Sequence, residues 1–274
     1  MTDHAPLVEG TNIDLRFSSA ELSEQRRLIT TFITETVENA GSTGVILGLS
    51  GGIDSTLVAY LAVEALGSDN VHGLILPSEV NPPTDESDAK RVATALDMPH
   101  DVIDIDPIVE AVLSAAPVNP TDQMAVGNVR VRTRAILNYY IANSEGSLVL
   151  GTGNRSEAAT GYFTKYGDQA VDCNPIGNLY KCQVRQLARE MGVPENLVTR
   201  EPTAAMWIDQ TDEDEMGVSY DELDAILALH IDGPFSKAAT QRILDVPMAM
   251  IDRVIELYEQ SAHKRSLPPS PTPL

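Results

Sequence analysis

The amino-acid sequence predicts an α/β protein in which an open parallel sheet carries helices on both faces. Apolar strand-like runs alternate with helical stretches between residues 45 and 115, and two of the strands end in glycine-rich turns, at 50–52 and 151–153. This alternation is typical of parallel strands joined by right-handed helical crossovers. The 274 residues, 43% of them hydrophobic, suffice to bury a core. We expect one domain over residues 1–265 and a disordered, Pro-rich tail at 266–274.

The first predicted element is a helix at residues 21–40, because its apolar residues recur at a helical spacing and Gly41 is placed to stop it. The following residues predict strands at 45–49, 71–76, 102–105 and 147–150, and helices at 55–66, 84–96, 107–115 and 121–142. Beyond a less regular stretch at 161–178, further helices are predicted at 179–191, 220–229, 236–244 and 248–262. The acidic segment 201–217 is expected to be a mobile loop. In open parallel sheets ligands bind beyond the carboxyl ends of the strands, so the two glycine-rich turns are expected to share one crevice.

The turn at residues 50–55, Ser-Gly-Gly-Ile-Asp-Ser, is the most informative motif. A buried strand that leads through two glycines into a helix directs several backbone N–H groups at one point, where the helix dipole adds partial positive charge. Pyrophosphate oxygens are the natural ligand of such a turn. The alternative is that Gly51 and Gly52 merely form a tight strand-to-helix connection.

This turn lacks the lysine of a Walker A loop, and Asp54 stands in the corresponding region. A carboxylate next to a polyphosphate requires a divalent cation between them, which makes Asp54 a candidate magnesium ligand. Glu157, just after the second glycine-rich turn, could provide a second carboxylate to the same ion. The alternative for each acid, taken alone, is a first-turn residue stabilised by the helix dipole, and for Glu157 this is the more common case.

The charge balance is strongly acidic, with 40 Asp and Glu against 19 Lys and Arg and a formal net charge of -21. This balance disfavours nucleic acid as a partner. It resembles proteins of salt-loving cells and predicts that stability rises with salt, since repulsion between surface charges is screened at high ionic strength. The two cysteines form no metal-binding motif. With neither a membrane span nor a signal peptide indicated, we expect a cytoplasmic protein that does not bind membranes.

Two further segments carry cations that a phosphate-bearing ligand would need. Residues 161–168 place Lys165 between two tyrosines, in a chain with only five lysines, and residues 128–134 contain Arg132 and Arg134, which are two apart on a predicted helix and so point in different directions. Ordinary surface charge is the competing interpretation for each of them.

Together these motifs resemble the ammonia-dependent NAD synthetases, within the N-type ATP pyrophosphatase superfamily. The resemblance spans about residues 19–268 and lies in segments 50–55, 128–134, 151–157, 164–168, 201–204 and 263–265. The first motif marks only the superfamily, whereas Thr-Lys-Tyr-Gly-Asp, Pro-Thr-Ala and the late His-Lys-Arg are more specific. Gly153, Asn154, Arg155 and Ser156 stand where many bacterial members have Asp-His-Ala-Ala, and this sequence resembles the archaeal form. The aromatic, acidic C-terminal end of bacterial members is replaced by residues 266–274.

The resemblance implies an adenine nucleotide alpha hydrolase-like fold and the ATP-dependent amidation of deamido-NAD by ammonia through an adenylated carboxylate. It also implies magnesium as cofactor, held by Asp54 and Glu157, and a homodimer with the dinucleotide near the subunit interface. By the same resemblance Asp168 would lie near the ammonia site as a catalytic residue together with Lys181, and deamido-NAD would be bound by Arg132, Lys165, Asp172, His263 and Lys264. ATP would be bound by Gly48, Leu49, Ser50, Gly51, Gly52, Ile53, Asp54, Ser55, Thr152, Lys181 and Thr203.

Other readings of the motifs remain open from the sequence. One is another adenylating ATP pyrophosphatase, such as the synthetase part of a GMP synthetase or a tRNA thiolase. The acidic surface argues against tRNA, and the absence of catalytic cysteine motifs argues against sulfur transfer. Another is a non-catalytic nucleotide-binding protein of the universal-stress type. A glutamine-dependent relative needs an additional amidase domain, so free ammonia is the expected nitrogen donor.

Overall fold

The computed structural model describes residues 13–116, 121–207 and 210–271. Its centre is a four-stranded parallel sheet in the order β3-β2-β1-β4, made of β1 (Val45–Gly48), β2 (Val71–Ile75), β3 (His100–Val102) and β4 (Leu148–Leu150). In this sheet Val45 of β1 lies opposite Val71 on one side and Leu148 on the other. The predicted parallel sheet is confirmed, and β1 is one of its two inner strands.

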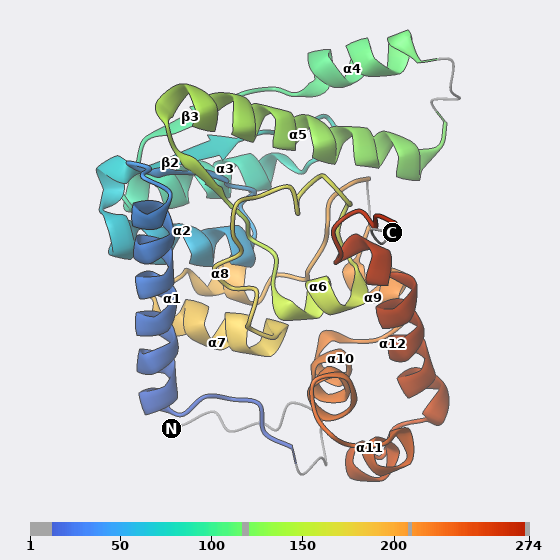
Figure 1. Cartoon of the computed structure of the whole chain (residues 1–274). Coiled ribbons are helices and arrows are strands. Elements are labelled where there is room, and N and C mark those ends of the chain that lie inside the picture. The colour runs from blue at the N-terminus through green and yellow to red at the C-terminus, as the bar shows by residue number, and fades with distance from the viewer. Residues whose placement is uncertain (1–12, 117–120, 208–209, 272–274) are drawn as a thin grey trace.

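Helices cover both faces of this sheet, as predicted (Figure 1). Because side chains of a strand alternate between faces, Leu47 and Ile46 of β1 enter different cores. The core on the Leu47 side contains residues of α1 (Ser19–Asn39), α2 (Ile53–Leu66), α3 (Pro83–Ala95), α7 (Lys181–Glu190) and α8 (Glu195–Val198). The core on the Ile46 side contains residues of α4 (Asp106–Ala115) and α5 (Gln123–Glu145).

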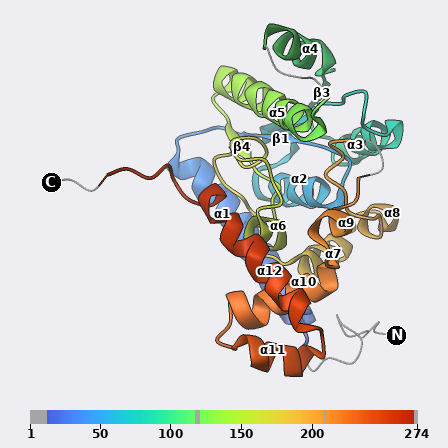
Figure 2. The ribbon, with the colours of Figure 1, turned by 90° about the vertical axis from the view of Figure 1, so that its right-hand side faces the viewer.

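A third hydrophobic core lies away from the sheet, among the helices at one end of the molecule (Figures 1 and 2). It joins α6 (Arg155–Thr160), α10 (Tyr220–Ile226) with its π-helical extension Leu227–Ile231, α11 (Lys237–Leu244) and α12 (Met248–Gln260). Tyr220 is fully buried in this core. After α12 a short 3₁₀ turn, Ala262–Lys264, brings the chain back to the irregular loop that follows α6.

The structure corrects some predicted boundaries. The expected mobile loop at 201–217 is wrong in its last part, where α9 (Asp212–Met216) forms. Its first turn is acidic, which the helix dipole favours, and the Thr211 side chain accepts a hydrogen bond from the Asp214 N–H. The strand expected at 102–105 lies earlier, at His100–Val102, and the helix expected to end at 142 continues to Glu145, where Gly146 adopts a left-handed conformation.

The C-terminal segment and the character of the helices relate to two further predictions, a disordered tail and the lack of a membrane span. Within the expected tail, residues 266–271 contain no helix or strand, and residues 272–274 lie outside the described part of the chain. None of the described helices combines the length and apolar character that a membrane span requires.

Candidate functional site

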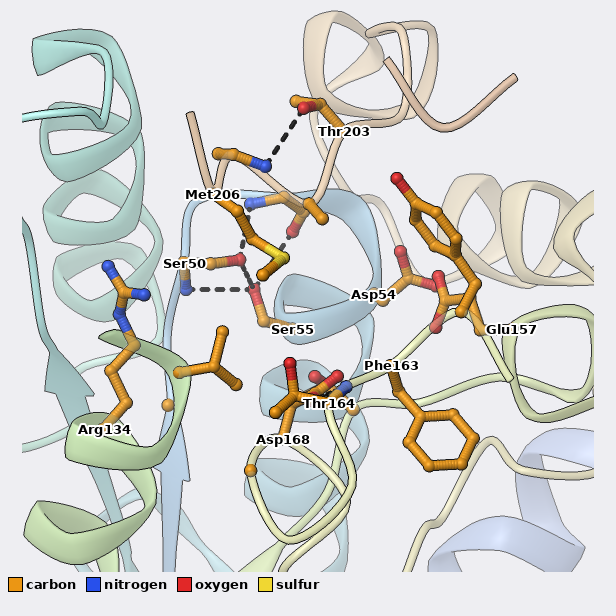
Figure 3. Close-up of a pocket in the computed structure, with 18 of the residues that line it drawn as sticks. Ser50, Asp54, Ser55, Arg134, Glu157, Phe163, Thr164, Asp168, Thr203 and Met206 are labelled. Carbon is orange, nitrogen blue, oxygen red and sulfur yellow. Dashed lines mark hydrogen bonds between the residues drawn. The ribbon is translucent and has the colours of Figure 1, made fainter. Parts of the chain in front are cut away.

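A cavity of about 820 Å³ opens at the carboxyl ends of β1, β2 and β4 (Figure 3). It is lined by the turn after β1, by the loop that runs from β4 through residues 161–168, by residues 200–206 and by the segment after α12. Its volume falls within the range of pockets that bind organic ligands of cofactor size. Both glycine-rich turns contribute to it, through Gly52 and Gly151, so the predicted common crevice is confirmed.

The turn after β1 has the geometry of an anion cradle. Leu49 continues the pairing of β1 with β2, and Gly52 is the N-cap of α2 without a side-chain cap. The Ser50 and Ser55 hydroxyl oxygens lie 3.0 Å apart, and the Ser50 hydroxyl accepts a hydrogen bond from the Gly52 N–H. No hydrogen bond among the described residues uses the N–H groups of residues 53–55, which therefore remain free to donate to a ligand at the start of the helix.

Gly51 has φ +82°, and a Cβ there would lie 2.3 Å from the Asp85 carbonyl oxygen. Glycine is therefore required by both the backbone angle and the close approach of α3. The sequence predicted that both glycines belong to a pyrophosphate-binding turn. At Gly51, however, the space is taken by the protein's own backbone, and Gly51 is not among the residues that line the cavity.

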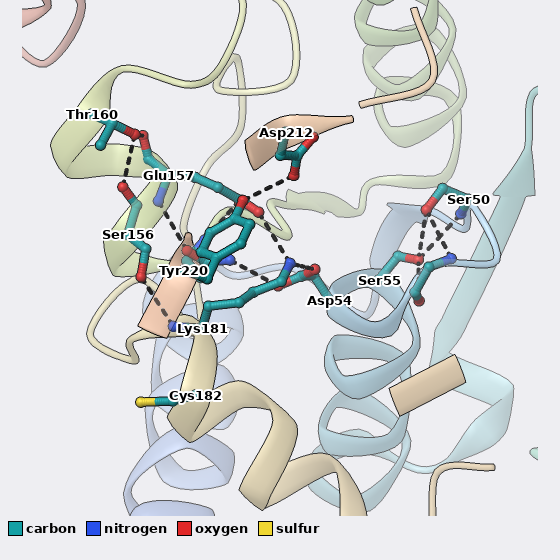
Figure 4. A network of polar contacts seen from close by, with 12 residues as sticks. Ser50, Asp54, Ser55, Ser156, Glu157, Thr160, Lys181, Cys182, Asp212 and Tyr220 are labelled. Atoms are coloured by element: carbon teal, nitrogen blue, oxygen red, sulfur yellow. Dashed lines mark hydrogen bonds and ion pairs between the residues drawn. The ribbon is translucent and has the colours of Figure 1, made fainter. Parts of the chain in front are cut away.

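Beside the cradle, Lys181 is buried between two carboxylates (Figure 4). Its Nζ lies 2.5 Å from Asp54 Oδ2 and 3.4 Å from Glu157 Oε1. Asp54 lies in the first turn of α2, Glu157 lies in the first turn of α6 and Lys181 is the first residue of α7, so three helix N-termini converge here. The Asn154 side chain caps α6 and donates to Asp54 Oδ1.

The charges of this cluster shift the pKa values of Glu157 and Lys181 because little water reaches the cluster to screen them. Burial, and then the nearby Asp54, raise the pKa of Glu157 well above its usual range, although Lys181 acts in the opposite direction. Burial alone would lower the pKa of Lys181, but Asp54 and Glu157 more than compensate and raise it. The ammonium is therefore held charged. Perturbed, buried titratable groups of this kind are typical of functional sites.

A third acid, Asp212, joins this cluster and was missed by the sequence reasoning. It is 4% exposed, and its Oδ2 accepts a hydrogen bond from the Tyr220 hydroxyl, while Oδ1 has no partner. The Tyr220 ring centre lies 5.2 Å from Lys181 Nζ, a cation–π distance. Asp212 belongs to an acidic run that resembles a solvated loop in sequence, and only the folding of α9 reveals that it is buried.

The carboxylates of this cluster are of the ligand type that magnesium takes. Asp54, Glu157 and Asp212 all line the cavity, so their oxygen atoms are within reach of a cation bound there. The buried Asp212 Oδ1 also lacks a hydrogen-bond partner, which a cation or its hydration shell would supply. Within the described ranges no group of three or more His, Cys, Asp or Glu side chains has metal-binding geometry, and Lys181 forms ion pairs with both Asp54 and Glu157.

The opposite side of the cavity carries Asp168. Its Oδ1 accepts a hydrogen bond of 2.8 Å from the Thr164 N–H. Solvent reaches this carboxylate through the cavity, but the surrounding protein removes much of its hydration, and this burial raises its pKa to about 6. Hydrogen bonds from the backbone and the charges of Lys264 and Arg134 oppose the rise. The carboxylate is thus poised near neutral pH.

The predicted cations border the same side. Lys165 Nζ donates to the His263 carbonyl at 2.7 Å, and Lys264 Nζ donates to the carbonyls of Gly161 and Phe163, so the end of the chain is tied to loop 161–168. Arg132 donates to the Lys165 carbonyl. Arg134 diverges from it, as predicted for residues two apart on a helix, and donates to the Leu76 carbonyl at the end of β2.

The structure brings together most of the predicted site residues. All of them line the cavity except Gly51 and Asp172. Asp172 is exposed and lies beside β4, where it accepts hydrogen bonds from the Val149 N–H and the Tyr139 hydroxyl. Thr152 lies in the second glycine-rich turn, and the Thr203 hydroxyl accepts a hydrogen bond from the Ala205 N–H in the strand-free segment before α9.

The fold and the site together define a nucleotide-binding α/β enzyme: an anion cradle at the end of an inner strand of a parallel sheet, with opposed carboxylates beside it. The family model described as NAD synthase matches residues 26–268. The chain is 56% identical over 259 residues to the NH(3)-dependent NAD(+) synthetase of Halobacterium salinarum, covering 94% of this chain and 97% of that protein.

Two solved structures are also similar. One is described as NMN synthetase from Francisella tularensis, with a TM-score of 0.81 and 36% identity over 93% of this chain and 99% of that one. The other is NH3-dependent NAD synthetase from Campylobacter jejuni in complex with nitrate ion, with a TM-score of 0.77 and 30% identity over 92% of this chain and 99% of that one. The chain belongs to the NAD synthase family.

Proposed function

We propose that this chain catalyses the ATP-dependent amidation of deamido-NAD by ammonia, giving NAD, AMP and pyrophosphate. The observation that carries the proposal is one cavity in which an anion cradle, a buried acid and lysine cluster and the Asp168 carboxylate face a common space. Membership of the NAD synthase family supports it.

The first step would be adenylation of the nicotinate carboxylate, which is a poor electrophile while ionised. A carboxylate oxygen attacks the α phosphorus of ATP, the bond from that phosphorus to the bridging oxygen breaks, and pyrophosphate leaves. The free N–H groups at the start of α2, with Ser50 and Ser55, would hold the departing phosphates. Lys181 lines the cavity, and its ammonium would donate to a phosphate oxygen while remaining next to Asp54.

Magnesium would be held by Asp54 and Glu157. When bound it would neutralise charge on the phosphates, as expected for a site without a Walker lysine. Asp212, which accepts a hydrogen bond from the Tyr220 hydroxyl, would add negative charge to the cluster and so favour the binding of a cation. The tyrosine ring and the two acids fix the Lys181 side chain, so positioning is largely complete before the substrate arrives.

In the second step, ammonia attacks the acyl carbon of the adenylate to form the amide. The bond from this carbon to the bridging oxygen breaks, and AMP leaves with that oxygen, which came from the nicotinate carboxylate. Asp168 would hold ammonium and accept a proton, because its pKa of about 6 lets it exist as the carboxylate at neutral pH. Arg132, Lys165, His263 and Lys264 would hold the dinucleotide. The two lysines each keep N–H donors beyond those they give to backbone carbonyls.

We further propose a two-fold homodimer formed through α5. Arg132, Ile136 and Tyr140 are spaced by four residues and share one face of this helix, and Ile136 and Tyr140 are 63% and 73% exposed. Exposed side chains of this size in one place suit an interface. Asp172, bound to Tyr139 of the same helix, would then lie where the dinucleotide extends from the cavity toward the partner subunit.

The cytoplasm of a salt-loving cell is the proposed setting. The formal charge of -21 supports it, since such a surface needs a high salt concentration for its charges to be screened. The similarity to the Halobacterium salinarum protein points in the same direction.

A second candidate is amidation of a mononucleotide, because one similar solved structure is described as an NMN synthetase. The two candidates share the adenylation chemistry and differ in the acceptor. Pyrophosphate release should be measured with ATP, magnesium and ammonium, and with deamido-NAD, nicotinate mononucleotide, xanthosine monophosphate or no acceptor. We expect deamido-NAD to have the highest kcat/KM. Faster turnover of nicotinate mononucleotide would establish the second candidate. Pyrophosphate release only when xanthosine monophosphate is the acceptor would contradict both.

A further inference from the structure

Arg200 is a charged residue of the cavity to which no role has been given above. It lies two residues after the end of α8 and three residues before Thr203, and 30% of its side chain is exposed. Its NH1 donates to the Gly51 carbonyl at 3.3 Å and to Asp85 Oδ1 at 3.1 Å, and its NH2 contacts Asp88 Oδ2. One guanidinium therefore joins the cradle to α3.

The acids that hold this guanidinium are fixed in place. Asp85 and Asp88 are three residues apart on α3 and so lie on the same face of the helix. The Asp88 side chain is only 5% exposed, and α3 is already so close to the cradle that the Asp85 carbonyl fills the space of a Cβ at Gly51. The forked shape of the guanidinium suits two carboxylates and a carbonyl at once.

The contact with Gly51 fixes the direction of a peptide group. A peptide is planar, so the Gly51 carbonyl and the Gly52 N–H point in opposite directions. Because the carbonyl is directed at Arg200, the N–H is directed to the other side of the peptide, where it donates to Ser50 Oγ at 3.2 Å within the cradle. If this peptide rotated, a carbonyl oxygen would face the phosphates and repel them.

We infer that Arg200 is a positioning residue for ATP: it holds the Gly51–Gly52 peptide with its N–H toward the pyrophosphate and its carbonyl away from it. This inference rests on the proposed function, because the cradle is taken to bind the pyrophosphate part of ATP. Arg200 acts through the backbone and through α3, and the same side chain links the cradle to the segment that carries Thr203.

The test compares R200Q with R91Q. Arg91 is a matched control because it pairs with the same Asp88, is 69% exposed and does not contact Gly51. Binding of inorganic pyrophosphate with magnesium is measured by calorimetry in molar KCl, where the screening length is about 3 Å and the lost charge itself has little long-range effect. We expect R200Q to weaken pyrophosphate binding and raise the KM for ATP about tenfold, as for one lost charge-assisted hydrogen bond. The KM for deamido-NAD should stay unchanged, and R200K should recover part of the loss.

The backbone can be observed directly. In the absence of any ligand, the amide NMR signal of Gly52 should shift in R200Q and not in R91Q. If the loss of one of the two partners of buried Asp88 prevents R200Q from folding, the double variant R200Q/D88N removes that buried charge and carries the same expectation. Wild-type pyrophosphate affinity in the R200 variants, an equal loss in R91Q, or an unmoved Gly52 signal would overturn the inference. Failure of the proposed function would differ from all of these, since the wild-type protein would then release no pyrophosphate with deamido-NAD.

Discussion

Replacing Gly51 by alanine tests why the turn after β1 has its shape. Gly51 has φ +82°, and a Cβ would lie 2.3 Å from the Asp85 carbonyl oxygen, whereas Gly41 has φ +64° and nothing within 4 Å of its Cβ position. An alanine in the left-handed region costs about 1–2 kcal/mol. Overpacking against fixed atoms adds about 1–3 kcal/mol. G41A should therefore lose about 1–2 kcal/mol of the free energy of unfolding, and G51A about 2–5 kcal/mol.

Urea unfolding in molar KCl, followed by circular dichroism, would measure both losses. Because α3 and the cradle must separate to admit the methyl group, G51A should also bind pyrophosphate more weakly, while G41A, which is distant from the cavity, should bind it normally. The reasoning would be refuted if G51A and G41A lost the same stability, since the contact with α3 would then carry no energy.

The remaining predictions concern the acids, the surface and the dimer. D54N should abolish pyrophosphate release and lower the free energy of unfolding by about 3–5 kcal/mol, as it removes the closest partner of buried Lys181; near-normal turnover would remove the magnesium assignment. At constant free ammonia, kcat should rise with pH through about 6 as Asp168 deprotonates, and D168N should lose this limb of the profile. The melting temperature should rise from dilute buffer to molar KCl, and an unchanged value would exclude the predicted effect of the acidic surface. I136D/Y140D should sediment as a monomer; a dimer of wild-type mass would exclude the α5 interface.

The sequence predicted the sheet and the cradle because each depends on local patterns. The alternation of apolar strands with helices needs no knowledge of distant contacts, and Ser50 to Ser55 contain in six residues the glycines, hydroxyls and acid of an anion-binding turn. The reason for Gly51 could not be predicted, because it depends on the backbone of α3, which lies more than thirty residues further along the chain.

The acidic cluster shows the same limit. Glu157 at a helix start was predicted, and α6 confirms that position. Asp212 was not, since an acidic run resembles a solvated loop until α9 packs it against Tyr220. The role of Arg200 is hidden for a related reason: its partners at 51, 85 and 88 come together only in the folded chain. Site residues that belong to one local motif could be predicted from the sequence. Site residues that depend on contacts between distant segments could not.

The fate of the carboxylate oxygen tests the central claim most directly. Deamido-NAD labelled with ¹⁸O in its nicotinate carboxylate would be turned over with ATP, magnesium and ammonium, and the AMP and pyrophosphate examined by mass spectrometry. Attack of the carboxylate on the α phosphorus predicts one labelled oxygen in AMP and none in pyrophosphate. Label in pyrophosphate or phosphate, or AMP without label, would contradict it.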